Sequence, residues 1–450
     1  MGWNKKKGSI IFYYPLAGWQ TELDRGMHRF PYSYWSLVPG LIQAGYSPQI
    51  YDGRLEEKIL ALDAIKRSTD IVFVGITAFT GTQLIDSMEF AKEVRAINPK
   101  IPIVWGGWHV TLSPEDSLKE DFVDIVVKGR GEETVVKVAN DIYDGNYVPK
   151  VIYEQAEVHE VFPRIPWEMI DINRYGPYFS YITSTGCAWH CTFCAFQTLY
   201  HGKMFFKPMD QVIEEMKYIV DHYNGLRMFY IDDELFFIKN DRVEEFCDRW
   251  ANYGRIPIIA LAHVNVVSKY DDNMWKKLVK GGFANLLIGA ESGNQIILNR
   301  LKKFQTPERM INFSAKAAEY GIGVTFSTMT GFLDSWELQD FRDTVLLLQK
   351  AAKLNPKFDF KMFWVRPYPG TELYNEFKEA GWRMPRTMRE WISYTFRYTP
   401  SWVDRELETQ VHYFLYTFWP RYGWNFMWDQ FIAEWKHARS IGPIQGPPGL

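Results

Sequence analysis

The chain has 450 residues, which suggests two or three domains at about 150 residues per domain. Its 51 basic and 54 acidic residues give a formal net charge of -3, so it has neither the basic surface typical of nucleic-acid-binding proteins nor an acidic tail. Its 47% hydrophobic and 23% charged residues are typical of a globular protein, and only four cysteines exclude a disulfide-built secreted scaffold. Aromatic residues make up 17% of the chain, an excess that needs an explanation.

The N-terminus carries no recognisable targeting signal. A basic start precedes an apolar run at residues 8–14, and no small-residue cleavage site follows, so this run is predicted to be a first strand rather than a signal peptide. The chain contains no run of about 20 apolar residues that could span a membrane. These patterns predict a cytoplasmic protein with no membrane span and no nucleic-acid partner.

Strand and helix signals alternate through the first 140 residues. The expected strands are 8–14, 48–51, 70–76, 101–105 and 124–128, and the expected helices include 34–45 and 84–97. Strands separated by helices of this length predict a parallel sheet with helices on both faces. Ligands bind such sheets at the carboxyl ends of the strands, where this chain has polar or Gly-rich loops. These loops are residues 52–54, 77–83, 106–109 and 128–132.

Three regions follow this first unit. Residues 141–177 contain several prolines and no clear periodicity, which predicts a linker. Residues 178–380 repeat the alternating pattern, which favours an open, partial α/β barrel with its catalytic end at the carboxyl ends of the strands. Its expected strands are 181–185, 228–231, 258–263, 284–289, 323–329 and 361–365. Residues 381–450 are dense in aromatics and predict helices, with a Pro- and Gly-rich tail from residue 442 that is expected to be disordered.

Three of the four cysteines lie within eight residues. Cys187, Cys191 and Cys194 have the spacing C-x3-C-x2-C directly after an expected strand. Thiolates are soft ligands for zinc or for iron–sulfur clusters. A structural zinc site closes with four ligands, and His190 would then be the fourth. Three thiolates on one loop instead favour a 4Fe–4S cluster with one iron open to a non-protein ligand. The fourth cysteine, Cys247, lies on a helical stretch and is expected to be a buried apolar filler.

The pattern C-x3-C-x-aromatic-C resembles the signature of the radical S-adenosylmethionine (SAM) superfamily. The resemblance implies a partial (β/α)6 barrel in which the open iron binds the amino and carboxylate groups of SAM. It further implies that Phe193, Ser327 and Met329 lie near the adenine, that Asp232 lies near the methionine moiety, and that Glu291 accepts from the ribose hydroxyls. Asp232 could instead cap the helix that follows it, and Glu291 could be a helix N-cap neighbour.

Four further polar residues are candidates for contact with the substrate. The resemblance places Asp233 and Glu234 at the end of the second barrel strand. Arg366 and Tyr368 fall in residues 366–371, which resemble a turn that closes the core in one large subgroup of the superfamily. Asp233, Tyr368 and Arg366 are expected to be catalytic, although Asp233 could also cap the next helix.

An α/β domain before such a barrel resembles the cobalamin-binding radical SAM proteins. Glycines at strand ends let the backbone approach a large flat ligand, and turn N–H groups meet its phosphate and amides. The residues that this resemblance assigns to cobalamin are Asp52, Arg54, Thr77, Phe79, Gly106, Gly107, His109, Gly129 and Glu132. An α/β domain with ordinary glycine turns, or one that has lost its ligand, is the alternative.

One departure concerns the lower face of the cobalt. Many cobalamin proteins supply a histidine from D-x-H-x-x-G, whereas residues 52–57 of this chain read DGRLEE. We therefore expect no histidine on cobalt from this domain, and Thr77, Phe79 or another neighbour is expected to face the lower side. The fold class implied is α/β, with a Rossmann-like cobalamin-binding domain (1–140), a linker (141–177), a radical SAM partial barrel (178–380) and an aromatic-rich helical region (381–450).

These resemblances imply a radical SAM C-methyltransferase that uses a 4Fe–4S cluster, SAM and cobalamin. In such enzymes cob(I)alamin takes a methyl group from one SAM. The reduced cluster cleaves a second SAM, and the resulting 5′-deoxyadenosyl radical takes hydrogen from an unactivated carbon, which then receives the methyl group. The protein positions the reactants and excludes water. An external electron donor of the ferredoxin or flavodoxin type and an oxygen-poor, reducing cytoplasm are implied.

Two other activities stay open. The N-terminal pattern is also similar to that of anaerobic porphyrin-ester cyclases, so ring formation or rearrangement with the same cofactors is the first alternative. The second is a non-enzymatic module that carries or senses cofactor. The expected substrate is a peptide or protein residue, such as a glutamine or arginine of methyl-coenzyme M reductase, ahead of a small metabolite. The aromatics after residue 381 would then cover the barrel mouth, grip the substrate or pack a helical lid.

Overall fold

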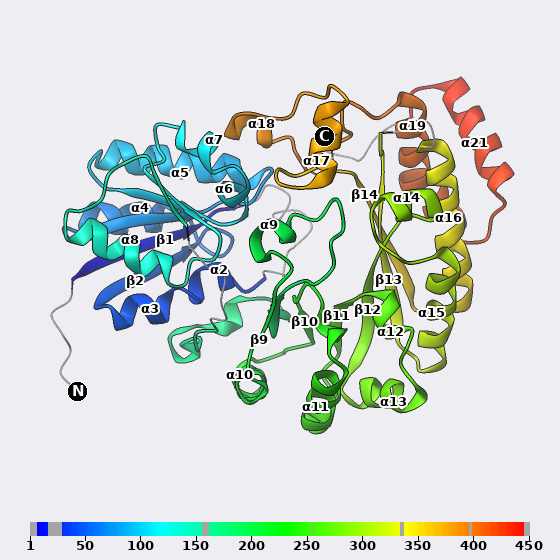
Figure 1. Cartoon of the computed structure of the whole chain (residues 1–450), viewed down its shortest axis with the longest axis horizontal. Coiled ribbons are helices and arrows are strands. Elements are labelled where there is room, and N and C mark those ends of the chain that lie inside the picture. The colour runs from blue at the N-terminus through cyan, green and yellow to red at the C-terminus, as the bar shows by residue number, and fades with distance from the viewer. Residues whose placement is uncertain are drawn as a thin grey trace.

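The computed structural model describes residues 7–16, 29–154, 162–253, 255–333, 337–395 and 398–444. The first six strands form one parallel sheet in the order β2-β1-β3-β4-β5-β6 (Figure 1). They are β1 (Gly8–Tyr14), β2 (Tyr46–Asp52), β3 (Ile71–Thr77), β4 (Ile103–Gly106), β5 (Ile125–Lys128) and β6 (Val151–Glu154). Alternate residues of β1 face opposite cores, since Ile10 and Phe12 pack on one side of the sheet and Ile11 and Tyr13 on the other.

Helices cover both faces of this sheet, as the sequence predicts. They are α2 (Tyr32–Trp35), α3 (Val38–Gln43), α4 (Lys58–Arg67), α5 (Gln83–Ile97), α6 (Trp108–Leu112), α7 (Pro114–Leu118) and α8 (Thr134–Tyr143). The expectation of one helix over residues 34–45 is wrong, because the chain forms two short helices there. Pro39 lies in the first turn of α3, where a missing N–H is tolerated. Within one continuous helix its missing N–H would leave a backbone hydrogen bond unmade, so α2 does not extend through it.

The stretch expected to be a linker, residues 141–177, is only partly irregular. It contains the last turn of α8 and strand β6, which pairs with β5 from Ile125↔Val151 to Lys128↔Glu154. Periodicity did not reveal β6 because it is a four-residue edge strand without buried residues.

The second sheet is also parallel and has the order β14-β13-β12-β11-β10-β7. Its strands are β7 (Tyr178–Tyr181), β10 (Met228–Ile231), β11 (Ile258–Ala262), β12 (Phe283–Glu291), β13 (Gly323–Thr330) and β14 (Phe358–Trp364). Six strands with β7 and β14 at the edges confirm an open α/β unit. The first strand, β7, covers residues 178–181 instead of the expected residues 181–185. Residues 184–186 do not continue this strand, because they pair antiparallel with residues 204–206.

The helices of this unit are α10 (Met209–His222), α11 (Asn240–Trp250), α12 (Val264–Val267), α13 (Asp272–Lys280), α14 (Gln295–Arg300), α15 (Pro307–Glu319), α16 (Glu337–Leu354) and α17 (Glu372–Glu379). A short hairpin, β8 (Ser184–Gly186) and β9 (Met204–Phe206), and helix α9 (Phe196–Tyr200) flank the cysteine loop. Cys247 lies on the buried face of α11 and packs in the core, as the sequence predicts for an apolar filler.

The aromatic C-terminal residues form packed cores rather than one lid. Helices α19 (Arg405–Tyr413), α20 (Trp419–Tyr422) and α21 (Trp428–Ile441), with a π-helical turn at Phe414–Phe418, pack against α16 and β14 (Figure 1). Helix α18 (Met388–Trp391) instead returns to the first unit and packs on α5. The tail expected to be disordered lies outside the described residues from 445 onward. Among the described helices, none is both long and apolar enough to cross a membrane.

Candidate functional site

The loop that carries Cys187, Cys191 and Cys194 is held in place at its first residue. Gly186 has a φ of 89°, and a Cβ added there would lie 2.2 Å from the Lys203 carbonyl oxygen, so only glycine lets β8 approach β9 this closely. The Gly186 N–H donates to the Glu234 carboxylate over 2.9 Å. Burial raises the pKa of Glu234 to about 8. Residue 234 thus ties the cysteine loop to the carboxyl end of β10.

The three thiols are partly buried, and none is in a disulfide. Burial raises the pKa of all three, to about 11 for Cys191 and about 12 for Cys194. A soft metal centre binds thiolates and displaces their protons. Three thiols on one loop, beside the buried cation Lys303, therefore fit the donor set of an iron–sulfur cluster. Among the described residues, no three His, Cys, Asp or Glu side chains gather closely enough to hold a single metal ion.

A buried ion pair stands beside the cysteines at the end of β12. Glu291 accepts from Lys303 Nζ over 3.2 Å, and both side chains are less than 10% exposed. Burial alone would lower the pKa of Lys303, but Glu291 and Cys191 raise it above its usual value, so this ammonium stays charged. Glu291 has a φ of 63°, and a Cβ at Gly289 would lie 2.4 Å from its carboxylate. A strained acidic residue at a strand end is typical of a ligand site.

The structure brings Phe193 and Met329 into one apolar cluster with Trp402. Ser327 lies two residues before Met329 on β13, opposite Gly289 of β12. These three predicted adenine neighbours therefore come from two segments that meet at the same end of the sheet. Asp232 pairs with Arg29 over 3.0 Å, and Arg29 also lies over the Tyr230 ring. The Asp232 carboxylate is the more exposed acidic group of its loop.

Asp233, which the sequence favours as catalytic, is fully occupied by hydrogen bonds from the segment that follows β7. Its carboxylate accepts from the Thr183 N–H, the Thr183 hydroxyl and the Ser184 hydroxyl, each over 2.6 Å, and the residue is 2% exposed. Burial raises the pKa of Asp233, although these hydrogen bonds oppose the shift. The geometry gives Asp233 a positioning role, because it locks the chain between β7 and β8 to the end of β10.

Arg366 and Tyr368 are likewise engaged within the fold. The Arg366 guanidinium donates to the carbonyl oxygens of Thr395, over 2.7 Å, and of Tyr398, and it lies near the Tyr394 ring. Burial lowers the pKa of Arg366 to about 10. The Tyr368 ring packs edge-on against Tyr394 at 5.8 Å. Both residues therefore anchor the segment that leads into the C-terminal helices.

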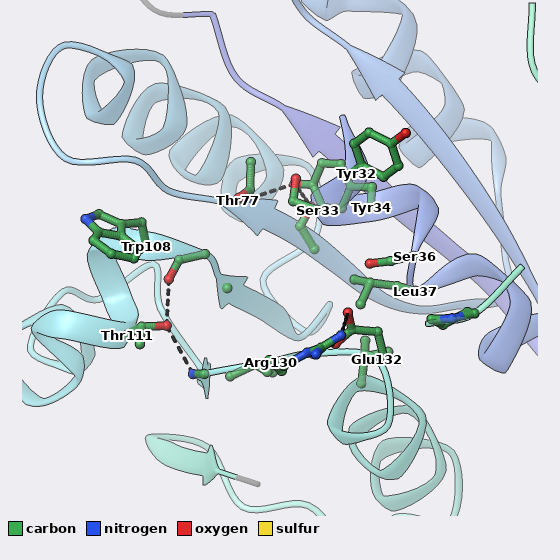
Figure 2. Close-up of a pocket in the computed structure, with 18 of the residues that line it drawn as sticks. Tyr32, Ser33, Tyr34, Ser36, Leu37, Thr77, Trp108, Thr111, Arg130 and Glu132 are labelled. Atoms are coloured by element: carbon green, nitrogen blue, oxygen red, sulfur yellow. Dashed lines mark hydrogen bonds and ion pairs between the residues drawn. The ribbon is translucent and has the colours of Figure 1, made fainter. Parts of the chain in front are cut away.

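A cavity of about 300 Å³ lies between the carboxyl ends of the first sheet and the barrel (Figure 2). From the first unit it is lined by Tyr32, Thr77, Gly106, Gly107, Trp108, Thr111, Gly129, Arg130 and Glu132, and from the barrel by Thr185, Tyr200 and Lys207. Thr185 lies on β8, two residues before Cys187, so the cavity extends to the strand that leads into the cysteine loop. None of the described lining residues is a histidine.

The cavity floor is built from glycine turns. A Cβ at Gly106 or at Gly129 would meet nothing within 4 Å, so both face open space that larger residues would fill. Gly107 has a φ of 92° and no room for a Cβ beside Thr77. The Thr111 hydroxyl donates to the Gly107 carbonyl over 2.8 Å and accepts from the Gly129 N–H over 3.1 Å (Figure 2). This open, backbone-lined cradle fits a large flat ligand such as a corrin.

Four residues predicted to bind cobalamin do not line the cavity. Asp52 and Arg54 form a buried bidentate pair, with N···O distances of 2.8 and 2.6 Å, and compensate each other's charge. His109 is 2% exposed, meets the Thr80 hydroxyl over 3.2 Å and packs edge-on against Trp391 of α18. Burial lowers its pKa to about 4. Phe79 is 53% exposed. For these four the structure does not support the predicted contact.

Several lining residues were missed by sequence reasoning. Trp108, Thr111 and Arg130 lie inside or beside the glycine loops, so their position along the chain could have found them. Tyr200 and Lys207 come from the barrel and carry no local signal. Lys303 was missed for the same reason, because its partner Glu291 is twelve residues away across a helix.

Comparisons with known proteins agree with this geometry. Residues 181–348 match the model of the radical SAM superfamily, and residues 35–139 match the model of the B12 binding domain. The chain is 27% identical to an uncharacterized methyltransferase of Pyrococcus horikoshii over 75% of this chain and 76% of the relative. It is 25% identical to the bacteriochlorophyllide d C-8(2)-methyltransferase of Chlorobaculum tepidum over 74% and 73% of the two chains.

Two solved structures share the fold. The radical SAM methyltransferase TsrM from Kitasatospora setae superposes with a TM-score of 0.67 and 16% identity over 83% of this chain and 76% of that one. The cobalamin-dependent radical SAM enzyme OxsB superposes with a TM-score of 0.72 and 14% identity over 96% and 71%. The two domain matches imply SAM, a 4Fe–4S cluster and cobalamin as cofactors, and the sites described above fit these groups. The chain therefore belongs to the radical SAM superfamily and carries a B12 binding domain before its radical SAM domain.

Proposed function

We propose that this protein methylates an unactivated carbon of its substrate. The observation that carries the proposal is the single cavity shared by the glycine cradle of the first sheet and by Thr185 of β8, the strand that leads into the cysteine loop. When bound, SAM on the reduced cluster supplies a hydrogen-abstracting radical, and cobalamin supplies a transferable methyl group. A methyl carrier and a radical source that open into one enclosed space can act on the same substrate carbon.

The chain's own residues hold and orient these groups. Cys187, Cys191 and Cys194 are proposed as the cluster ligands. Phe193, Asp232, Glu291, Ser327 and Met329, with Lys303, are proposed to surround SAM. Thr77, Gly106, Gly107, Gly129 and Glu132 are proposed to hold cobalamin. Asp233 and Arg366 are assigned positioning roles. Asp233 is held by Thr183 and Ser184, and Arg366 is held by the carbonyl oxygen of Thr395, so each side chain connects two segments of the fold. The domain limits 178–380 and 381–450 belong to the same proposal, whereas the first domain extends beyond residue 140 to include β6.

We propose a peptide or protein side chain, glutamine or arginine, as the substrate, and a ferredoxin- or flavodoxin-type protein of a reducing cytoplasm as the electron donor. A tetrapyrrole is the competing substrate class, because relatives of this chain methylate bacteriochlorophyllide d by name. Reduced flavodoxin, the reconstituted protein and SAM with a deuterated methyl group are incubated with glutamine- and arginine-containing peptides, or with bacteriochlorophyllide d. The proposed reaction transfers the labelled methyl group to a peptide carbon and yields S-adenosylhomocysteine and 5′-deoxyadenosine in equal amounts.

Ring closure is the second candidate, since the chain is 22% identical to the anaerobic magnesium-protoporphyrin IX monomethyl ester cyclase of Synechocystis over 76% of this chain and 72% of the relative. A cyclase forms no S-adenosylhomocysteine, so SAM cleavage without that product would favour it. If the labelled methyl group appears on the tetrapyrrole and not on a peptide, the proposed methyl transfer stands but the proposed peptide substrate is wrong. A loaded protein that does not cleave SAM at all would favour a cofactor carrier or sensor.

A further inference from the structure

The cysteine loop rests on a histidine from a distant strand end. Trp189 lies between Cys187 and Cys191, and its ring stacks on His263 with a centroid distance of 4.1 Å and an angle of 7°. His263 follows strand β11 and caps helix α12, where its Nδ1 accepts from the Asn265 N–H over 3.2 Å. The two side chains are 74 positions apart in sequence, and the sequence analysis assigned no role to either, although Trp189 lies inside the C-x3-C motif.

Each ring of this stack carries a buried nitrogen without a hydrogen-bond partner. These atoms are Trp189 Nε1 and His263 Nε2. Because Nδ1 of His263 accepts a hydrogen bond, the proton of the neutral ring is on Nε2. Burial lowers the pKa of His263 to about 3, so the ring is neutral. Both atoms are therefore N–H donors that lack an acceptor among the residues that the structure describes.

Leaving a buried donor without a partner costs about 1–3 kcal/mol, and several buried indole N–H groups of this protein lack a partner among the described residues. Two of them occur here in one stack, and one belongs to a residue flanked by two cluster cysteines. Lys303 also contributes to the electrostatics of both His263 and the cysteines, which places the stack and the cysteines around the same buried region. A cluster held by Cys187, Cys191 and Cys194 would bring sulfur acceptors into this region.

We propose that Trp189 Nε1–H and His263 Nε2–H donate hydrogen bonds to sulfur atoms of the 4Fe–4S cluster and raise its reduction potential. Hydrogen bonds to sulfur are one of the main determinants of cluster potential, because they stabilise the more negative, reduced state. The stack thereby eases electron entry from the external donor. This inference rests on the cluster of the proposed function but not on methyl transfer.

The test is a redox titration of the reconstituted protein without SAM, followed by electron paramagnetic resonance of the reduced cluster. Trp189→Phe and His263→Phe keep an aromatic ring in the stack and remove the donor. We expect each to lower the equilibrium constant for reduction by about three- to tenfold, where tenfold is about 59 mV for a one-electron couple. Trp250→Phe is the matched control, because Trp250 Nε1 is also buried without a partner and its ring also stacks, on Tyr253, but in the outer helix layer.

A second measurement uses the unsubstituted protein and so does not depend on the variants loading a cluster. Electron–nuclear double resonance on protein grown with ¹⁵N-tryptophan should show a coupled nitrogen at the reduced cluster. An unchanged potential in both variants, or no coupled nitrogen, overturns the inference. Weaker SAM binding at unchanged potential also overturns it, because it assigns the donors to SAM. Loss of methyl transfer has no bearing, since potential and coupling are read without substrate.

Discussion

Removing the Asp233 carboxylate should destabilise the barrel rather than stop a chemical step alone. This side chain accepts three hydrogen bonds of 2.6 Å from Thr183 and Ser184 and is 2% exposed. In Asp233→Ala, these three donors lose a shared acceptor between the chain that follows β7 and the end of β10. The neighbouring Asp232 offers a matched control, because its partner Arg29 has a side chain that is 62% exposed.

The magnitude follows from burial and from the number of bonds. A hydrogen bond to a charged group contributes about 1.5–3 kcal/mol, and breaking a buried charged network typically costs about 3–5 kcal/mol. We therefore expect Asp233→Ala to lose about 3–5 kcal/mol of stability. Asp232→Ala should lose less than about 1 kcal/mol, because exposed ion pairs contribute little. For a unit of about 200 residues, each kcal/mol shifts the melting temperature by roughly 2–4 °C.

The assay is thermal unfolding by circular dichroism, with iron content measured on the same samples. Asp233→Ala should melt at least about 6 °C below the unsubstituted protein, and Asp232→Ala within about 4 °C of it. Because the network positions the cysteine loop, the iron content of Asp233→Ala should fall as well. Equal melting temperatures for the two variants would refute the positioning role and return Asp233 to the catalytic candidates.

Four further outcomes are expected. Cys191→Ser should lose the visible absorption of the cluster and SAM cleavage but keep the helical circular dichroism signal, since a thiolate ligand is removed. Gly129→Val should lower the cobalamin stoichiometry at unchanged iron content, because its side chain enters the open cradle. Glu291→Gln should weaken SAM binding by about tenfold in calorimetry, equivalent to about 1.4 kcal/mol. The melting temperature of Glu234→Gln should rise relative to that of the unsubstituted protein from pH 5 to about pH 8 and then level off. Because the pKa of Glu234 is raised from 4.5 to about 8, the folded unsubstituted protein binds more protons than its unfolded chain between these two values, so its stability falls as pH rises through this window.

Matched controls separate these effects from general damage. Gly145 also has a positive φ and open space but lies outside the cavity, so Gly145→Val should retain cobalamin. Glu372 forms an exposed pair with Lys302, so Glu372→Gln should bind SAM normally. Full cobalamin loading of Gly129→Val, full iron content of Cys191→Ser, or a Glu234→Gln difference that is constant with pH would each contradict the corresponding assignment.

Local patterns carried the sequence prediction furthest. Strands 8–14 and 228–231 match β1 and β10 residue for residue. Their boundaries are predictable because each strand is a hydrophobic run bounded by polar or glycine residues that lie next to it in sequence. The cysteine spacing and the glycine loops were also visible, since each occupies one short stretch of chain. The strand β6 escaped notice because an exposed four-residue edge strand has no periodicity to read.

Motif position identified strand ends but not the direction of each side chain. His109 stands in the expected glycine segment, yet it points to Thr80 and Trp391 and fills the contact with α18. Asp52 and Arg54 lie in the expected loop, yet they form an ion pair with each other instead of lining the cavity. These outcomes depend on which partner is nearest in space, which a linear motif does not encode.

The sequence by itself determined two α/β units, three cysteines on one loop and glycine turns at the carboxyl ends of strands, because these follow from spacing and periodicity along the chain. Only the tertiary structure decided that the glycine cradle shares a cavity with β8, which leads into the cysteine loop, that Lys303 meets Glu291, and that Trp189 stacks on His263. It also resolved the aromatic excess after residue 381 into packed cores on α16 and α5. Contacts between residues tens of positions apart arise from packing of whole elements, so they appear only when the chain is folded.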